Sequence, residues 1–468
     1  MSRRLALSLI ALGLSGCISL DPHYRRPAQP TPATWPTGPA YAPQPAAEAR
    51  IVGWRAFFID PRLNTVIGQA LTNNRDLRVA LANIQIARAQ YDIQRSQLFP
   101  TLDAQAGATF GREPLTTSGG PAPTGHINIH QFNLGLGVSG YELDLFGRQR
   151  SLSRAAFEQY LATDQARRAA QISLVAQVAS AWLTVGSDNA LLGVAKDTAA
   201  SAESSLNLTR ARFTGGIASE LDVSQAATLA EQAHYDVAHL TTQVAQDVNA
   251  LTLLVGASVD PALLPTGVAD NAVLQDLPAG VSSAVLLQRP DILQAEDQLK
   301  ADNADIGAAR AAFFPTLSLT ASGGLASNAL SMLFSAGSGA WSFAPQITAP
   351  IFDAGRNRAG LASARATREV GQAQYEKAIQ TGFRDVADAL AQRGTIGAQL
   401  AAQQGLVAAA ADGLRLAQAR YTGGVDTYLD VLIAQRTYYT ARQTLIAAQL
   451  AEGANLVTLY TALGGGLD

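Results

Sequence analysis

Cysteine, lysine and charged residues in general are scarce in this sequence of 468 residues. It has one cysteine, three lysines and 15% charged residues, with a net charge of −3. A single cysteine excludes a disulfide within the chain and a metal site built from several thiolates. A slightly acidic chain without a cluster of Lys and Arg is not expected to bind nucleic acid.

Residue patterns that carry catalysis or cofactor binding are also missing from the sequence. The five histidines have no third ligand at a spacing that holds a metal ion, so we expect no metal site. No nucleophile–base pair and no phosphate-binding loop is present, and the run Gly464–Gly466 lies in the C-terminal tail. The sequence therefore predicts a protein that is not an enzyme and that needs no cofactor.

The first residues have the features of a bacterial export signal. Arg3 and Arg4 precede the apolar run Leu5–Leu14, which is too short to span a bilayer. The segment Leu14–Cys17 then resembles a lipobox, in which cleavage leaves an acylated cysteine at the N-terminus. We expect Cys17 to anchor the protein in outer-membrane lipid; a buried cysteine in an uncleaved anchor is the alternative. Eight prolines between residues 18 and 50 predict an extended tether after it.

The rest of the chain contains an internal duplication. Arg212–Gly216 returns as Arg420–Gly424, 208 residues later, and Phe99–Leu102 returns as Phe314–Leu317, 215 residues later. The difference places a longer insertion in the first copy. A duplicated unit predicts two halves that do equivalent jobs around a common axis.

Within each copy, two stretches alternate apolar residues with small or polar ones. They cover 102–111 and 132–145 in the first copy, with a phase slip at Gly140, and 317–322 and 341–351 in the second. No Asp, Glu, Lys or Arg occurs between Ala311 and Phe352. Four such strands of about ten residues are typical of transmembrane β-strands with a polar face toward a lumen. A soluble β-sandwich is the alternative.

Long alanine-rich helices follow each pair of strands. The predicted helices are 61–98, 147–212 and 219–255 in the first copy, and 286–313, 355–420 and 427–463 in the second. The longest have about 65 residues and are on the order of 100 Å long. A heptad seam in 219–255, interrupted at Asp247, predicts packing of paired helices.

Four membrane strands cannot close a barrel, because lipid does not tolerate open strand edges and single-chain barrels start at about eight strands. Three copies of the chain supply twelve strands. The predicted fold is therefore mainly α with a transmembrane β part: a homotrimeric 12-stranded β-barrel, four strands per chain, continued by a long periplasmic α-helical barrel.

Several short segments, each weak alone, form a specific set. They are Asp60-Pro61, Asn74–Arg78, Glu142–Arg148, Arg289–Ile292, Phe314–Leu317 and Pro350–Arg356. Together they resemble the outer-membrane factor family, the TolC-like and NodT-type exit ducts of tripartite efflux systems. The resemblance implies a trimeric channel that passively conducts drugs or toxic compounds. It also implies two partners: a periplasmic adaptor (membrane fusion protein) and an inner-membrane pump of the RND class.

The turns between the long helices are the candidate sites for adaptor docking. They consist of Thr214, Gly215 and Gly216 in the first copy and Thr422, Gly423 and Gly424 in the second. They are the points of the helices farthest from the strands, so we expect them at the periplasmic mouth. Simple helix termination by glycine is the alternative, and both roles are compatible.

The residues just after these turns are candidates for a gate. The candidate gate residues are Asp222, Asp426, Leu429, Asp430 and Arg436. In this hypothesis a ring of carboxylates surrounds the closed aperture, Leu429 is an apolar plug, and arginines hold the ring by hydrogen bonds. The alternative for Asp222 and Asp430 is a capping box, since each lies three residues after a Ser or Thr.

The resulting organisation has five parts. They are a signal peptide (1–16), a lipid-anchored tether (17–50), a first repeat (51–256), a linker (257–285) and a second repeat (286–468). Type I secretion or metal-ion export remains an alternative role for the duct. The sequence has only two methionines, and this scarcity argues weakly against a copper or silver pathway. A non-conducting structural lipoprotein is the alternative from another class.

Overall fold

The structure is a computed structural model that describes residues 19–41, 53–114, 125–268 and 282–466. The predicted signal peptide and Cys17 lie outside the described residues. The chain forms two compact units. One contains Ile84–Thr163 and Ala295–Gln374 with the described residues up to Pro27, and the other contains Ala28–Asn83, Asp164–Gln294 and Tyr375 onward. Each unit therefore contains residues from both copies of the duplication.

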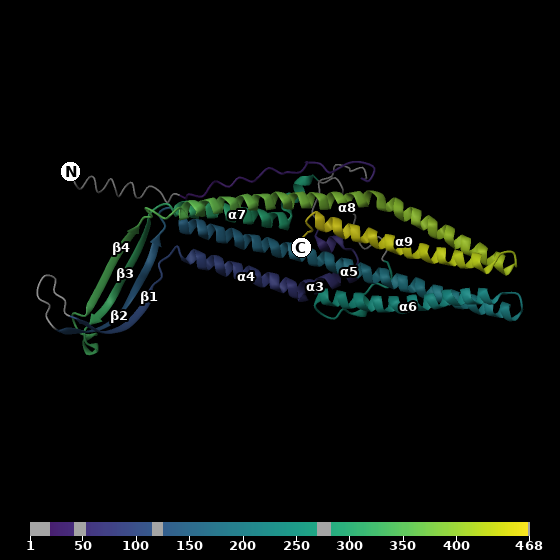
Figure 1. Cartoon of the computed structure of the whole chain (residues 1–468), viewed down its shortest axis with the longest axis horizontal. Helices are drawn as coiled ribbons and strands as arrows, with labels where there is room; N and C mark the ends of the chain where they lie inside the picture. Colours follow the sequence, from purple (N-terminus) through teal and green to yellow (C-terminus); the bar gives the residue numbers. More distant parts are fainter. Residues whose placement is uncertain (1–18, 42–52, 115–124, 269–281, 467–468) are drawn as a thin grey trace. The chain divides into compact units, whose positions relative to one another are not determined.

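The order of the elements repeats (Figure 1). In the first copy they are α3 (Pro61–Asn73), α4 (Arg75–Ser96), β1 (Asp103–Pro114), β2 (His126–Leu143), α5 (Arg148–Thr214) and α6 (Glu220–Val255). In the second copy they are η3 (Ser283–Gln288), α7 (Pro290–Ala311), β3 (Thr316–Ser327), β4 (Gly339–Thr348), α8 (Arg356–Thr422) and α9 (Tyr428–Ala462). The predicted fold of one chain, mainly α with four strands in two halves, is confirmed.

The prediction of one helix over 61–98 is wrong at Asn74, which separates α3 from α4. Its backbone is extended, with ψ of 135°. Its buried side chain accepts a hydrogen bond from Leu77 N (2.8 Å) and donates one to Leu254 O (2.8 Å). Asn74 therefore caps the start of α4 and ties this break to α6.

The four strands form one antiparallel sheet in the order β1-β2-β3-β4. β1 and β4 are its two edges. The register of β2 against β3 shifts between Val138 and Tyr141, where Gly140 has φ of 67°. The phase slip predicted at Gly140 is therefore a bulge that needs a left-handed backbone.

The two faces of the sheet differ in chemistry. Because residues opposite one another share a face, Ala108 with Phe132, Leu134 with Leu325, and Ala321 with Phe343 make one face apolar. The other face pairs small and polar residues: Gly107 with Asn133, Gly135 with Gly324, and Ser322 with Ser342. This is the pattern of a strand that meets lipid on one side and water on the other.

An extensive apolar core lies in the second unit. Trp54, Phe57 and Phe58 pack with Trp182 of α5 and Tyr460 of α9, and Phe57 stacks on Tyr460 at 4.7 Å. Each such buried side chain contributes roughly 1.5–3 kcal/mol. An 18-residue window of α5 has the length and apolar composition of a membrane span, but half of it is buried inside the protein.

The N-terminal segment is bound to the helices in both units. In the first unit, Arg26 donates two hydrogen bonds to Glu296 (2.8 and 2.7 Å), and Arg310 donates to Leu20 O (3.0 Å). In the second unit, Trp35 is buried and stacks on Phe383 at 4.9 Å. Part of the predicted tether is thus held by specific contacts.

Two carboxyl groups from facing helices meet between α5 and α6. Burial, then a hydrogen bond and repulsion from Asp247, raises the pKa of Asp188 to about 6. Apart from a proton on Asp188, no group among the described residues donates to the buried Asp247 Oδ2. Protonated Asp188 can therefore donate a hydrogen bond to Asp247, the residue that interrupts the heptad seam.

This pair predicts a dependence of stability on pH. Folding raises the pKa of Asp188 from 3.8 to about 6. The contribution of this pair to the free energy of unfolding should therefore be fully present below the unfolded pKa and should be lost as pH rises through about 6. In Asp188→Asn, the amide replaces the proton permanently, so the apparent Tm should change less with pH and exceed that of the wild type near neutral pH. Thermal unfolding followed by circular dichroism in detergent measures both. An unchanged pH dependence in the variant would contradict this account.

Candidate functional site

The two hairpin turns end their helices in the same way. Gly216 and Gly424 have φ of 71° and 72°, a left-handed conformation that favours glycine. Ile217 N donates to Arg212 O (2.8 Å), and Val425 N donates to Arg420 O (2.9 Å). These bonds satisfy carbonyl groups at each helix end, so the glycines have the predicted role in termination. They also leave Ile217 and Val425 as exposed apolar residues at the tips.

Both candidate gate carboxylates at the helix starts form capping interactions. Asp222 Oδ2 accepts from the backbone N (2.9 Å) and the hydroxyl (2.8 Å) of Ser219. Asp430 Oδ2 accepts from the backbone N (3.2 Å) and the hydroxyl (2.7 Å) of Thr427. The capping alternative therefore describes the geometry of both residues within one chain.

The two equivalent arginines of the tips have different partners. Arg420 forms a bidentate pair with Asp426 (2.5 and 2.8 Å), which lowers the pKa of that carboxyl. The first copy has Ala218 at the equivalent position, 208 residues earlier. Arg212 instead lies 4.4 Å from the ring centroid of Tyr421 and donates to Tyr421 O (3.3 Å). One arginine therefore braces its own hairpin, and the other joins the two hairpins.

Tyr428 is the centre of the contact between the two hairpins near their tips. It is buried, its ring lies 5.4 Å from that of Tyr421, and its hydroxyl lies 3.2 Å from Ser205 Oγ. Burial raises the pKa of Tyr428, so its hydroxyl stays protonated. Ala226 and Val431 pack into the same cluster.

Two polar contacts continue this seam between the hairpins. Tyr439 donates to Asp236 (2.9 Å), and Arg442 pairs with Asp197 (3.1 Å). Burial, followed by the hydrogen bond to Asp236, raises the pKa of Tyr439. Both contacts join α9 to the first hairpin, so α9 is held along its length.

The proposed plug lies on an exposed face of α9. Leu429 and Ile433 are 48% and 56% exposed and lie one turn apart. Arg436 follows on this face and is exposed. The described residues contain no ion pair between Arg436 and either Asp426 or Asp430. One chain therefore brings the apolar residues and Arg436 to one face, but it does not form the predicted arginine–carboxylate network.

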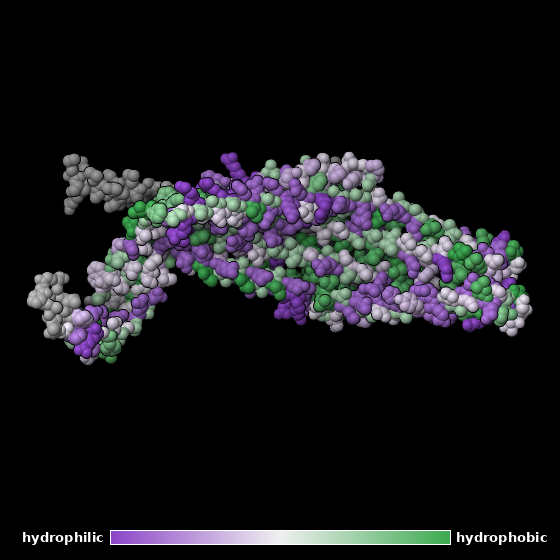
Figure 2. Space-filling view, in the orientation of Figure 1, coloured by the Kyte–Doolittle hydropathy of each residue, from purple (hydrophilic) through white to green (hydrophobic). Residues whose placement is uncertain are grey.

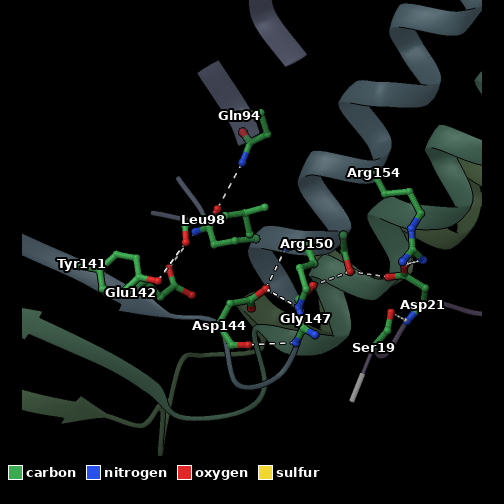
Figure 3. A network of polar contacts seen from close by, with 12 residues as sticks. Ser19, Asp21, Gln94, Leu98, Tyr141, Glu142, Asp144, Gly147, Arg150 and Arg154 are labelled. Carbon is green, nitrogen blue, oxygen red and sulfur yellow. Dashed lines mark hydrogen bonds and ion pairs between the residues drawn. The ribbon is translucent and has the colours of Figure 1, made fainter. Parts of the chain in front are cut away.

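The junction between strand and helix explains one of the family landmarks (Figure 3). Asp144 accepts from the backbone N (2.9 Å) and Nε (3.1 Å) of Arg150, and Glu142 accepts from Arg148 (2.9 Å). Asp21 of the N-terminal segment accepts hydrogen bonds from Ser151 and Arg154. The acidic residues of Glu142–Arg148 thus fix the start of α5 just after the sheet.

The sequence reasoning missed the residues that join the two hairpins. The missed residues are Arg212, Tyr421, Tyr428, Tyr439 and Arg442 and their partners Ser205, Asp236 and Asp197. A signal for them exists in the duplication, because Tyr428 and Tyr439 stand where the first copy has Glu220 and Glu231. At these two positions, a change from Glu to Tyr accompanies a contact that only the second copy makes. Among the described residues, no group of three or more His, Cys, Asp or Glu has metal-binding geometry.

The sequence and the fold of the chain are similar to those of known proteins. A family model described as outer membrane efflux protein matches residues 66–257 and 281–465. The antibiotic efflux pump outer membrane protein ArpC of Pseudomonas putida is 48% identical, over 99% of this chain and 95% of that protein. The solvent efflux pump outer membrane protein SrpC of Pseudomonas putida is also 48% identical, over 98% of each. The open state of the MtrE outer membrane channel of Neisseria gonorrhoeae is similar with a TM-score of 0.85 and 39% identity, over 96% of this chain and 99% of that one.

The unequal roles of the two arginines give a matched pair of variants. Arg212→Ala should loosen both tips, because it removes a contact between hairpins worth about 0.5–2 kcal/mol. Arg420→Ala should loosen only the second tip, because its partner lies in the same hairpin. Hydrogen exchange of the tip amides, measured by mass spectrometry, distinguishes the two. Faster exchange confined to the first tip in Arg212→Ala would contradict this assignment.

Proposed function

This chain belongs to the outer membrane efflux protein family, and from that premise we propose that it is the exit channel of a tripartite pump for small toxic compounds. Its place in the outer membrane and its role in efflux follow from the family and from close relatives. Two relatives of 48% identity are named for antibiotic and solvent efflux, which supports antibiotics and organic solvents as the class of substrate. Outer-membrane transport needs a partner as its energy source, since the chain has no nucleotide-binding motif.

The observation that carries this proposal is the four-stranded sheet with one apolar face and two open edges. An open edge in lipid leaves unpaired N–H and C=O groups, each costing several kcal/mol. Pairing of β1 of one copy with β4 of the next satisfies these groups. Three copies then form a 12-stranded barrel with the small and polar face around a water-filled lumen.

Anchoring and domain organisation complete the proposal. Acylation of Cys17 after removal of residues 1–16 holds the chain in outer-membrane lipid, and residues 17–50 lead to the folded body. The repeats 51–256 and 286–468, joined by 257–285, supply two pseudo-equivalent segments of wall per copy. The contacts of residues 19–36 with the helices support a tether that is fixed to the wall.

The partners we propose are a periplasmic adaptor and an inner-membrane pump of the RND class. The adaptor docks on Thr214–Gly216 and Thr422–Gly424, where exposed Ile217 and Val425 offer apolar contact surface. Near these tips, Leu429 narrows the aperture, with Asp430, Asp426 and Asp222 forming a ring of carboxylates. Arg436 pairs with carboxylates of a neighbouring copy. The exposure of Leu429 and Arg436 on one face of α9 supports this arrangement.

Efflux is tested in the native cell. Deletion of the gene should increase retention of a hydrophobic dye and sensitivity to organic solvents, and the intact gene should restore both. The duct is then necessary for export of this class of compound. Unchanged retention and sensitivity, in a strain that expresses the chain under the same conditions, would contradict the proposed substrate class.

The gate is tested by two equivalent leucines. Leu429 and Leu221 hold the same position in the two hairpins and are both exposed. Glycine at either position destabilises its helix by a similar amount, about 1 kcal/mol. Leu429→Gly should produce larger and longer openings in a planar bilayer, and Leu221→Gly should resemble the wild type with small, rare openings. Equal openings in both variants would show loosened hairpins and no plug. Large conductance in the wild type would also contradict a gate at Leu429.

A further inference from the structure

The loop between β3 and β4 has an unusual composition for a loop at a strand end. Residues 328–338 contain no Asp, Glu, Lys, Arg or His. They include the short helix η4 (Leu330–Met332) and three exposed apolar side chains: Leu330 at 61%, Met332 at 58% and Phe334 at 74%. Loops in water normally expose polar residues, and contiguous exposed apolar residues mark a surface that binds something.

Several polar groups of the same loop bond to one another. The serine hydroxyls at 335 and 338 donate to Met332 O (2.6 Å) and Ser335 O (2.9 Å), and Ser327 Oγ accepts from Ala329 N (3.3 Å). Ala326 N donates to Ser338 O (2.8 Å) across the base of the loop. Polar groups that bond to one another cost less to remove from water than unpaired ones, so these bonds suit a loop at the boundary of the membrane. Asn328 and Ser331 are exposed, as are the three apolar side chains, so the loop offers both kinds of group to the boundary between acyl chains and head groups.

The loop starts where the apolar band of the sheet ends. Ser327, the last residue of β3, is opposite Phe132, which is opposite Ala108. Among the described strands, only β1 and β2 remain paired beyond this level. On this part of the hairpin, the face that is apolar nearer the helices carries Phe110, His130, Asn128 and Arg112. Polar and basic residues with aromatic Phe132 beside them are typical of the boundary between hydrocarbon and head groups.

We propose that the 328–338 loop is a lipid-binding surface, in which Leu330, Met332 and Phe334 insert among acyl chains at the outer boundary of the membrane. The uncharged composition, the internally bonded serines and the continuity with the lipid-facing band all favour acyl chains over water. Leu333, between the exposed Met332 and Phe334, is buried. The two hairpins of one chain therefore end differently: the β3–β4 hairpin in lipid and the β1–β2 hairpin beyond it. This inference rests on the outer-membrane location and is independent of substrate, partners and gate.

Tryptophan fluorescence of the full-length protein in vesicles tests the proposal. The background is Trp341→Phe, which removes the tryptophan of β4 and leaves Trp35, Trp54 and Trp182 in every variant. Phe334→Trp in this background reports on the loop. Asn128→Trp in the same background is the matched control on the part of the β1–β2 hairpin that extends past the apolar band. The probes are a brominated phospholipid in the vesicles and acrylamide in the buffer.

The difference from the background gives the signal of each new tryptophan. The proposal predicts that Trp at 334 is quenched severalfold more by the brominated lipid than Trp at 128, and less by acrylamide. Quenching of Trp at 334 by acrylamide alone would place the loop in water and overturn the proposal. Protection from both quenchers would place it against protein, such as the loops of other copies, and would also overturn it. Flotation of each variant with the vesicles confirms insertion.

Discussion

The constraint on which this structure depends is that a strand in lipid must be paired along both edges. In one chain β2 and β3 meet this condition, whereas β1 and β4 do not. Further copies of the chain can pair with both edges. The apolar face then remains in contact with lipid, and no unpaired backbone group is exposed to it. The close approach of β2 and β3 also requires residues without a side chain at Gly135 and Gly324. A Cβ on Gly135 would lie 2.8 Å from Gly323 O, so a side chain there would force the strands apart.

The duplication supplies the scaffold, and divergence between its copies supplies the specific contacts. Both copies end their hairpins at a left-handed glycine and start the return helix with an acidic cap. Only the second copy has an acidic partner for its tip arginine, and Tyr428 and Tyr439 of that copy bind the first hairpin. In a pore lined by the two hairpins of each chain, successive hairpins are similar in shape but differ in their side chains. Movement of α9 relative to the first hairpin must therefore break these contacts.

Much of the fold could be predicted because its signals are local and periodic. Alternation of apolar residues located the four strands, the slip at Gly140 located the bulge, and Thr-Gly-Gly located both tips. The break at Asn74 was missed because it depends on a contact with α6, 180 residues away. The seam between hairpins was missed for the same reason: periodicity shows that a face is packed, but it does not show which helix packs there. Cys17 and the gate depend on processing and on neighbouring copies, so the sequence supports them only through motif and position.

The most direct test of the central claim is the number of chains in the particle that detergent extracts from the outer membrane, measured by native mass spectrometry. Each chain supplies four strands, and the barrel of this fold has twelve, so three chains are expected in every membrane-inserted particle. A single chain that remains folded and inserted would show that the sheet closes or is capped in another way. That result would contradict the account.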